Sequence, residues 1–143
     1  MSEDVAENRV DDRELVIDFD RDDIYTHHGE PFTGMSYSLF PNGTLCAEGS
    51  LIDGMETGYF RSWYSNGQIK EDHPPYNIED RTYREWHKNG RLAVVGRCKF
   101  EKTIERKKWD EVGNVSEHWL ASGVTPQIPD QPKQELIDIA RAE

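Results

Sequence analysis

Large apolar residues recur along the chain at a nearly constant distance from a glycine. Gly43, Gly67, Gly90 and Gly113 follow one another at intervals of 24, 23 and 23 residues. Each has a large apolar residue four positions before it and an aliphatic residue two positions after it. A unit of this length cannot bury a core alone, so the spacing predicts an array of similar units that stack on one another.

Each unit is predicted to be a β-hairpin with a tight turn. Asn-Gly dipeptides stand between aromatic and β-prone residues at 42–43, 66–67 and 89–90. Both residues tolerate positive φ, which a two-residue type I′ turn requires. Such a turn pairs Tyr64 with Ile69 and Trp63 with Lys70 across the two strands. In the fourth unit the Asn-Gly order is lost, as is common in a terminal repeat.

The connections between hairpins are marked by a second set of glycines. They stand within 29–34 and 54–58, where the chain returns to begin the next strand. Before the third unit these glycines are replaced by Pro74 and Pro75. Because proline cannot donate to a β-ladder, we expect a longer loop or a bulge there.

The pattern divides the chain into three parts. Residues 13–120 are expected to be mainly β, an elongated array of stacked antiparallel β-hairpins. Residues 1–12 hold few apolar groups and are expected to be an acidic, flexible tail. Residues 121–143 contain Pro126, Pro129 and Pro132 and then apolar residues at helical spacing, which predicts a linker and a short helix near 134–141.

The periodic apolar position favours a core role. Residues Leu39, Trp63, Trp86 and Trp109 occupy it, and an array needs one repeating contact in each unit. On the other face, Tyr64, His87 and Asp110 occupy equivalent places and differ in chemistry. This variation is typical of a surface that serves one particular partner, so Tyr64 and His87 are predicted to lie at or near a contact.

The net charge of −11 is concentrated before the repeats. Residues 1–30 contain eleven acidic and three basic residues, a balance of −8, whereas residues 31–120 are nearly neutral. Nucleic acids and anionic lipids are bound mainly by Lys and Arg, so this balance argues against both. A protein partner with a basic surface fits better. The aspartates predicted to steer it are Asp18, Asp20, Asp22 and Asp23, and the alternative left open is that this acidic segment serves only to keep the protein in solution.

The sequence predicts no catalytic, cofactor or metal site. It contains no Ser-His-Asp order and no phosphate-binding loop. His27 and His28 are adjacent and point to opposite sides of an extended segment, while His73, His87 and His118 are each isolated. No apolar run approaches the length of a membrane span, and we expect a cytoplasmic protein that is not an enzyme.

Several of these phrases resemble the MORN-repeat variant family, which includes YwqK-type toxin–antitoxin antitoxins. The resemblance covers about residues 15–118 and is carried by Gly29-Glu-Pro-Phe-Thr-Gly34, Asn42-Gly43, Gly54-Met-Glu-Thr-Gly58-Tyr59 and Trp63-Tyr-Ser-Asn-Gly67. It implies stacked β-hairpins and protein binding, in some members as an immunity protein that neutralises a toxin. The alternative that it leaves open is a scaffold or adaptor for a cellular protein, with no toxin involved.

Overall fold

The computed structural model describes residues 8–131, which form two β-sheets. The large sheet contains nine strands: β1 (Arg9–Asp11), β5 (Gly34–Leu39), β6 (Leu45–Ile52), β7 (Met55–Trp63), β8 (Ile69–His73), β9 (Asp80–Trp86), β10 (Leu92–Lys99), β11 (Lys102–Trp109) and β12 (Val115–Leu120). The small sheet contains β2 (Val16–Asp18), β3 (Ile24–His27) and β4 (Glu30–Pro31), and a 3-10 turn, η1 (Asp12–Glu14), precedes it.

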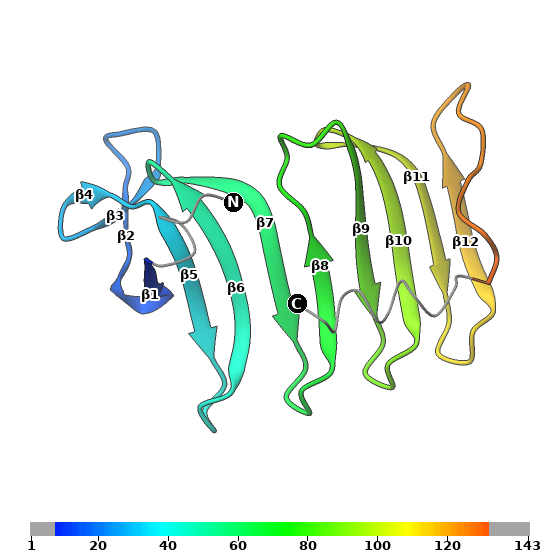
Figure 1. The fold of residues 1–143 in the computed structure, drawn as a ribbon, viewed down its shortest axis with the longest axis horizontal. Coiled ribbons are helices and arrows are strands. Elements are labelled where there is room, and N and C mark those ends of the chain that lie inside the picture. The colour runs from blue at the N-terminus through cyan, green and yellow to red at the C-terminus, as the bar shows by residue number, and fades with distance from the viewer. Residues whose placement is uncertain (1–7, 132–143) are drawn as a thin grey trace.

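The predicted mainly β fold with a large antiparallel sheet of hairpins is confirmed. From β5 to β12 the strands lie side by side in chain order, each antiparallel to the next (Figure 1). The predicted helix near 134–141 lies outside the described residues. No helix within residues 8–131 is long and apolar enough to cross a membrane.

The N-terminal boundary differs from the prediction. Strand β1 pairs in parallel with β5, with Val10 opposite Ser36, and Val10 is only 7% exposed. Residues 9–11 therefore belong to the sheet rather than to a flexible tail, because Val10 supplies one of the apolar side chains that cover the first strands.

The turns of the hairpins also differ from the prediction. Tyr64 and Gln68 close a three-residue loop, in which the Gly67 amide donates to the Tyr64 carbonyl at 3.0 Å and the Tyr64 amide donates to the Gln68 carbonyl at 2.8 Å. Only Gly67 in this loop has positive φ, +89°, as in a type I turn followed by a bulge. Trp63 therefore pairs with Ile69, and the pairing predicted for a two-residue turn is wrong by one position.

The asparagine of each Asn-Gly pair explains why the larger loop forms. Asn66 Oδ1 accepts a hydrogen bond from the amide of Gln68 at 2.9 Å, and Asn42 and Asn89 repeat the contact with the residue two positions ahead. This side-chain bond satisfies the backbone amide of the residue that closes the loop, Gln68 in the second unit. A two-residue turn does not require such a bond. A turn with positive φ at both central residues does occur at Asp53 and Gly54, in the return connection between β6 and β7.

The return connection with the two prolines confirms the predicted interruption of the sheet. Residues 74–79 form a loop, and β8 pairs with β9 only through Glu71 with Glu85 and Asp72 with Arg84. The ladder is correspondingly short between the second and third hairpins.

The predicted core position is confirmed for the three tryptophans. Trp86 and Trp109 are 1% and 4% exposed and pack with Ile69, Leu92 and Val95, and the partly buried Trp63 packs against this group. Leu39, in the equivalent place of the first unit, is 45% exposed, so the prediction is wrong for that residue. The core is thus concentrated in the later hairpins.

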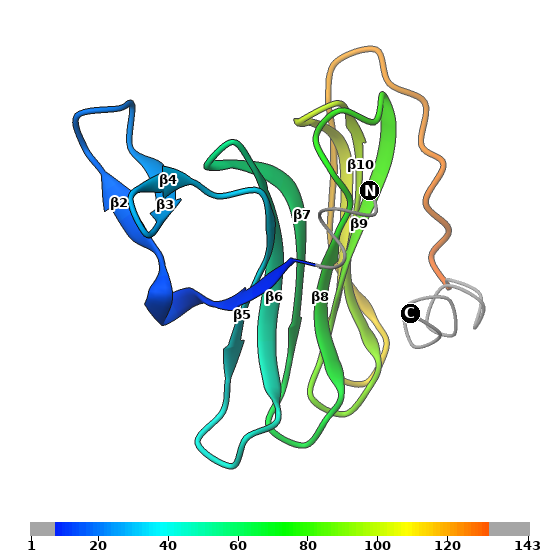
Figure 2. The same cartoon turned by 60° about the vertical axis from the view of Figure 1, so that its left-hand side comes forward.

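Residues 121–131, which we call the strap, cover the tryptophan core (Figure 2). Ile128 is 7% exposed and belongs to the same apolar cluster, and the Trp109 indole donates to the carbonyl of Asp130 at 2.7 Å. Lys107, 4% exposed, donates to the carbonyl of Ile128 at 2.8 Å. This segment was predicted as a linker, and the structure shows it as part of the core.

Glu105 joins the strap to the sheet. Its carboxylate is completely buried and accepts hydrogen bonds from Arg97, His118 and the backbone amides of Gln127 and Ile128. Burial alone raises the pKa of this carboxyl, but the two amide bonds and the two side-chain bonds outweigh burial and lower the pKa to about 2.

The small sheet covers the opposite face at the other end of the large sheet. Phe32, Leu51 and Val10 form a second buried cluster, against which Leu15 and Tyr25 pack. In Figure 2 the small sheet and the strap lie on opposite sides of the large sheet. Each end of the sheet therefore has one covered face and one open face.

Replacing Gly67 tests the turn assignment. We expect Gly67→Val to lower the free energy of unfolding by about 1–2 kcal/mol, because a β-branched residue is strained at positive φ. Space is available, since a Cβ added at this position would meet no atom within 4 Å, so the loss reports on backbone conformation alone. Chemical denaturation measures it. The matched control is Ser65→Val in the same loop, and equal losses for both variants would contradict the assignment.

Replacing Glu105 tests the attachment of the strap. We expect Glu105→Gln to lower the free energy of unfolding at pH 7 by about 3 kcal/mol, because it leaves buried donors facing a neutral amide. A carboxyl whose folded pKa is depressed stabilises the fold above its ordinary value of 4.5, and this contribution disappears as the pH falls toward about 2.

The difference between the native chain and Glu105→Gln should therefore shrink when denaturation is repeated at pH 3. Glu117→Gln, which changes an exposed carboxylate on β12, is the control and should cost less than about 1 kcal/mol. A difference that grows at pH 3 would contradict this role of the Glu105 charge.

Candidate functional site

A cleft of about 490 Å³ lies between the small sheet and the open strands at the N-terminal end of the large sheet. Its floor is formed by β5, β6 and β7, where small residues such as Ser36, Ala47 and Gly49 leave room. Leu15 and Tyr25 form the wall on the side of the small sheet, and Tyr76 closes the far side. The cleft exists because the small sheet stands away from these strands instead of packing flat on them.

The lining combines aromatic rings with carboxylates. Phe60 and Tyr76 are 37% and 44% exposed, and Asp12, Glu48 and Glu56 add acidic groups. Aromatic residues are the usual anchors of protein interfaces, and carboxylates attract cationic side chains. The lining therefore suits a segment that carries both apolar and basic groups.

Glu48 is held in place by its neighbours. Its two oxygens accept hydrogen bonds from the Tyr59 hydroxyl at 3.0 Å and from Arg9 at 3.2 Å. Burial, with the Glu48 charge beside it, raises the pKa of Tyr59 to about 12, so this hydroxyl remains a donor at neutral pH. The carboxylate is thus fixed in position beside the cleft.

The four predicted aspartates lie in and beside the loop between β2 and β3. Asp18 is paired with Arg21 at 2.6 Å, and this bond lowers the pKa of Asp18. Asp20, Asp22 and Asp23 are exposed and make no ion pair with another described residue. Three of the four predicted carboxylates are therefore exposed to solvent and available to attract a basic partner.

A second hollow of about 320 Å³ links this loop to the cleft. Asp22 and Asp23 line it together with Met55, and it shares Tyr25 and Glu56 with the cleft. Phe19 at the loop and Met55 at the β6–β7 turn are 77% and 62% exposed, so apolar surface accompanies the charge. Two of the four predicted aspartates, Asp22 and Asp23, therefore lie close to the exposed apolar side chain of Met55.

Tyr64 and His87 lie elsewhere. Both follow the ends of their strands at the hairpin turns, and β7 alone spans nine residues, roughly 27 Å, between Met55 and Trp63. The Tyr64 hydroxyl donates to the carbonyl of Trp86 at 2.7 Å, and His87 Nε2 lies 2.8 Å from the carbonyl of Trp109. Each side chain bridges its hairpin to the next one, 22 residues ahead, so the variable position has a structural role.

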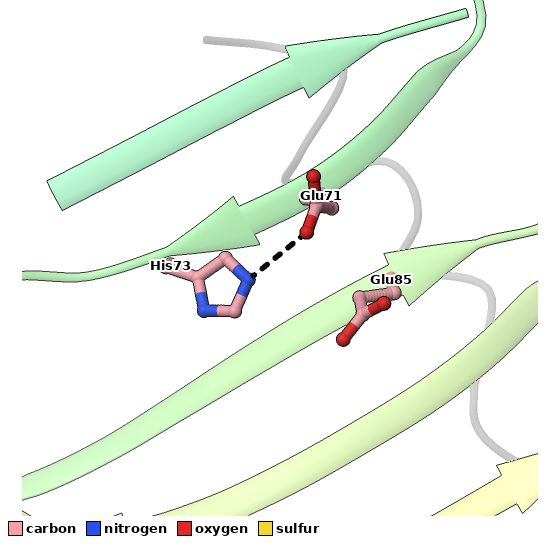
Figure 3. Close-up of side chains that lie close together, drawn as sticks. All are labelled: Glu71, His73 and Glu85. Carbon is pink, nitrogen blue, oxygen red and sulfur yellow. Dashed lines mark ion pairs between the residues drawn. The ribbon is translucent and has the colours of Figure 1, made fainter. Parts of the chain in front are cut away.

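One group of residues near the cleft was not found by sequence reasoning. His73, which was expected to be isolated, lies close to Glu71 and Glu85, and one ligand atom of each side chain lies within 4.8 Å of the others (Figure 3). The signal available in the sequence was Glu71-Asp72-His73, because residues two apart on a strand share a face. The contribution of Glu85 depends on the register across the proline loop, which no local pattern gives.

Comparisons with known protein families, with curated proteins and with solved structures found no match for this chain. The resemblance to the MORN-repeat variant family therefore stays a prediction. Function is argued below from the geometry of the cleft and from the residues around it.

Tyr64→Phe tests whether the Tyr64 hydroxyl holds adjacent hairpins together. We expect it to lower the free energy of unfolding by about 0.5–1.5 kcal/mol, because one hydrogen bond between hairpins is lost. The matched control is Tyr76→Phe, whose hydroxyl bonds to no described residue and whose loss should stay within about 0.5 kcal/mol. Equal stabilities of the native chain and Tyr64→Phe would contradict the bridge.

Proposed function

We propose that this protein binds another protein through the cleft between its two sheets and the acidic loop beside it. The observation that carries the proposal is the coincidence of a concave surface, exposed aromatic side chains and unpaired carboxylates at one end of the molecule. The loop attracts a basic partner over a distance, and Phe60 and Tyr76 make short-range contacts once it has docked.

The proposed partner is a toxin, and the protein acts as its immunity protein or antitoxin. Support comes from the resemblance of the hairpin phrases to the MORN-repeat variant family and from the acidic charge, which suits a toxin whose active surface is basic. Binding over that surface would block access to the toxin's substrate. The competing proposal is a scaffold or adaptor that uses the same cleft for a cellular protein.

Co-expression separates the two proposals. If the product of the gene adjacent to this chain's own gene is toxic to a host cell, co-expression of this chain should restore growth, and the two proteins should copurify. A harmless adjacent product, or toxicity that this chain does not relieve, would contradict the immunity proposal.

Charge variants of the loop test the route of binding. We expect Asp22→Asn with Asp23→Asn to lower the association rate several-fold at low salt and less at physiological salt, because salt screens the attraction. Asparagine tolerates the positive φ of both positions, 56° and 59°, so the loop should keep its shape. Stopped-flow association with the copurified partner measures the rate.

Glu101→Gln with Glu111→Gln is the matched control, since it removes the same charge from exposed positions in the β10–β12 part of the sheet. This control should leave the association rate within about twofold. If both double variants slow association equally, the loop has no special role and only net charge matters.

A further inference from the structure

The strands β8 and β9 bring three metal-ligating side chains to one face of the sheet. Glu71 and His73 are two residues apart on β8, and Glu85 is the direct cross-strand partner of Glu71. His73 Nε2 lies 3.7 Å from a Glu71 oxygen, and one ligand atom from each residue falls within 4.8 Å of the others (Figure 3). All three side chains are half-buried, so the group is shielded and still reachable from solvent.

Neighbouring residues orient two of these ligands. Ser62 donates to Glu71 Oε2 at 2.7 Å, while the other oxygen, Oε1, faces His73. The His73 ring stacks on Tyr83 at 5.0 Å and 14° between planes. Tyr83 itself lies over Gly96, where a side chain would come within 2.1 Å of the ring. Supports of this kind are what hold ligands at metal sites.

The pairing of Glu71 with Glu85 is unfavourable without a counter-ion. Like charges directly opposite each other on adjacent strands destabilise a sheet. Lys70 and Lys108 offset part of this repulsion, although Lys108 also lies 3.7 Å from Glu117. A divalent cation between the carboxylates would remove the conflict.

We propose that Glu71, His73 and Glu85 bind a divalent transition-metal ion, with Zn²⁺ the best fit. Imidazole nitrogen and carboxylate oxygen are both ligand types that Zn²⁺ takes, and three protein ligands leave a fourth position for water, whereas Mg²⁺ and Ca²⁺ prefer oxygen alone. Zinc bonds of about 2.0–2.2 Å place tetrahedral ligand atoms roughly 3.5 Å apart. The side chains reach that spacing by shifts of about 1 Å, which rotamer adjustments supply.

Formation of the site does not require the proposed partner. It needs only the short β8–β9 ladder, and it uses none of the acidic-loop residues. His73 also lines the cleft, so a bound ion would stand at its edge and add positive charge beside Phe60. The expectation from sequence that this chain holds no metal is therefore tested directly by the following experiment.

The metal-free full-length chain is titrated with Zn²⁺ by calorimetry at pH 7, and Mg²⁺ is titrated separately. We expect saturable binding of one Zn²⁺ per chain and no saturable heat with Mg²⁺. His73→Gln and Glu85→Gln should each weaken Zn²⁺ binding at least tenfold. Glu85→Gln keeps the shape of the side chain and removes the repulsion, so it should fold at least as well as the native chain by circular dichroism.

His28→Gln is the matched control, because His28 is an exposed histidine near the acidic loop. It should bind Zn²⁺ as the native chain does. The proposal is overturned if the native chain shows no saturable binding, if His73→Gln and Glu85→Gln bind Zn²⁺ as tightly as the native chain, or if His28→Gln alone weakens it. Failure of these titrations leaves the partner experiments unaffected, since those variants lie in the loop.

Discussion

The structure depends on the repeated contact that joins one hairpin to the next. The side chains of Tyr64 and His87 each form a hydrogen bond with a backbone carbonyl 22 residues ahead. The tryptophans of the successive units pack together in one apolar cluster. Such a contact extends the sheet strand by strand but leaves the apolar side chains on both of its faces exposed. The small sheet covers part of one face, and the strap covers part of the opposite face.

The two covers differ in how closely they pack, and this difference places the candidate site. The strap lies directly on the sheet because Glu105 and Lys107 satisfy its backbone groups and Ile128 fills the apolar surface. The small sheet contacts β6 through Leu51 and then turns away, which leaves the cleft. The Glu71, His73 and Glu85 group lies on the next two strands, β8 and β9, and His73 also lines the cleft.

The local structure could be predicted from the sequence, whereas contacts between segments distant in the sequence could not. The glycine spacing predicted the hairpins and their order, since a glycine with positive φ is a local requirement. The pairing register was missed because the Asn66 side chain closes a larger loop. The strap was interpreted as a linker, because the burial of Ile128 depends on donors from Lys107 and Trp109 that no local pattern reveals.

Hydrogen–deuterium exchange of the chain with and without its bound partner tests the central claim, that the cleft is the binding surface. The account predicts that the partner slows exchange in residues 22–26, 47–60 and 73–77, with the hairpin turns at 64–68 and 87–91 unchanged. Slowed exchange confined to those turns or to the strap, with the cleft strands unaffected, would contradict it.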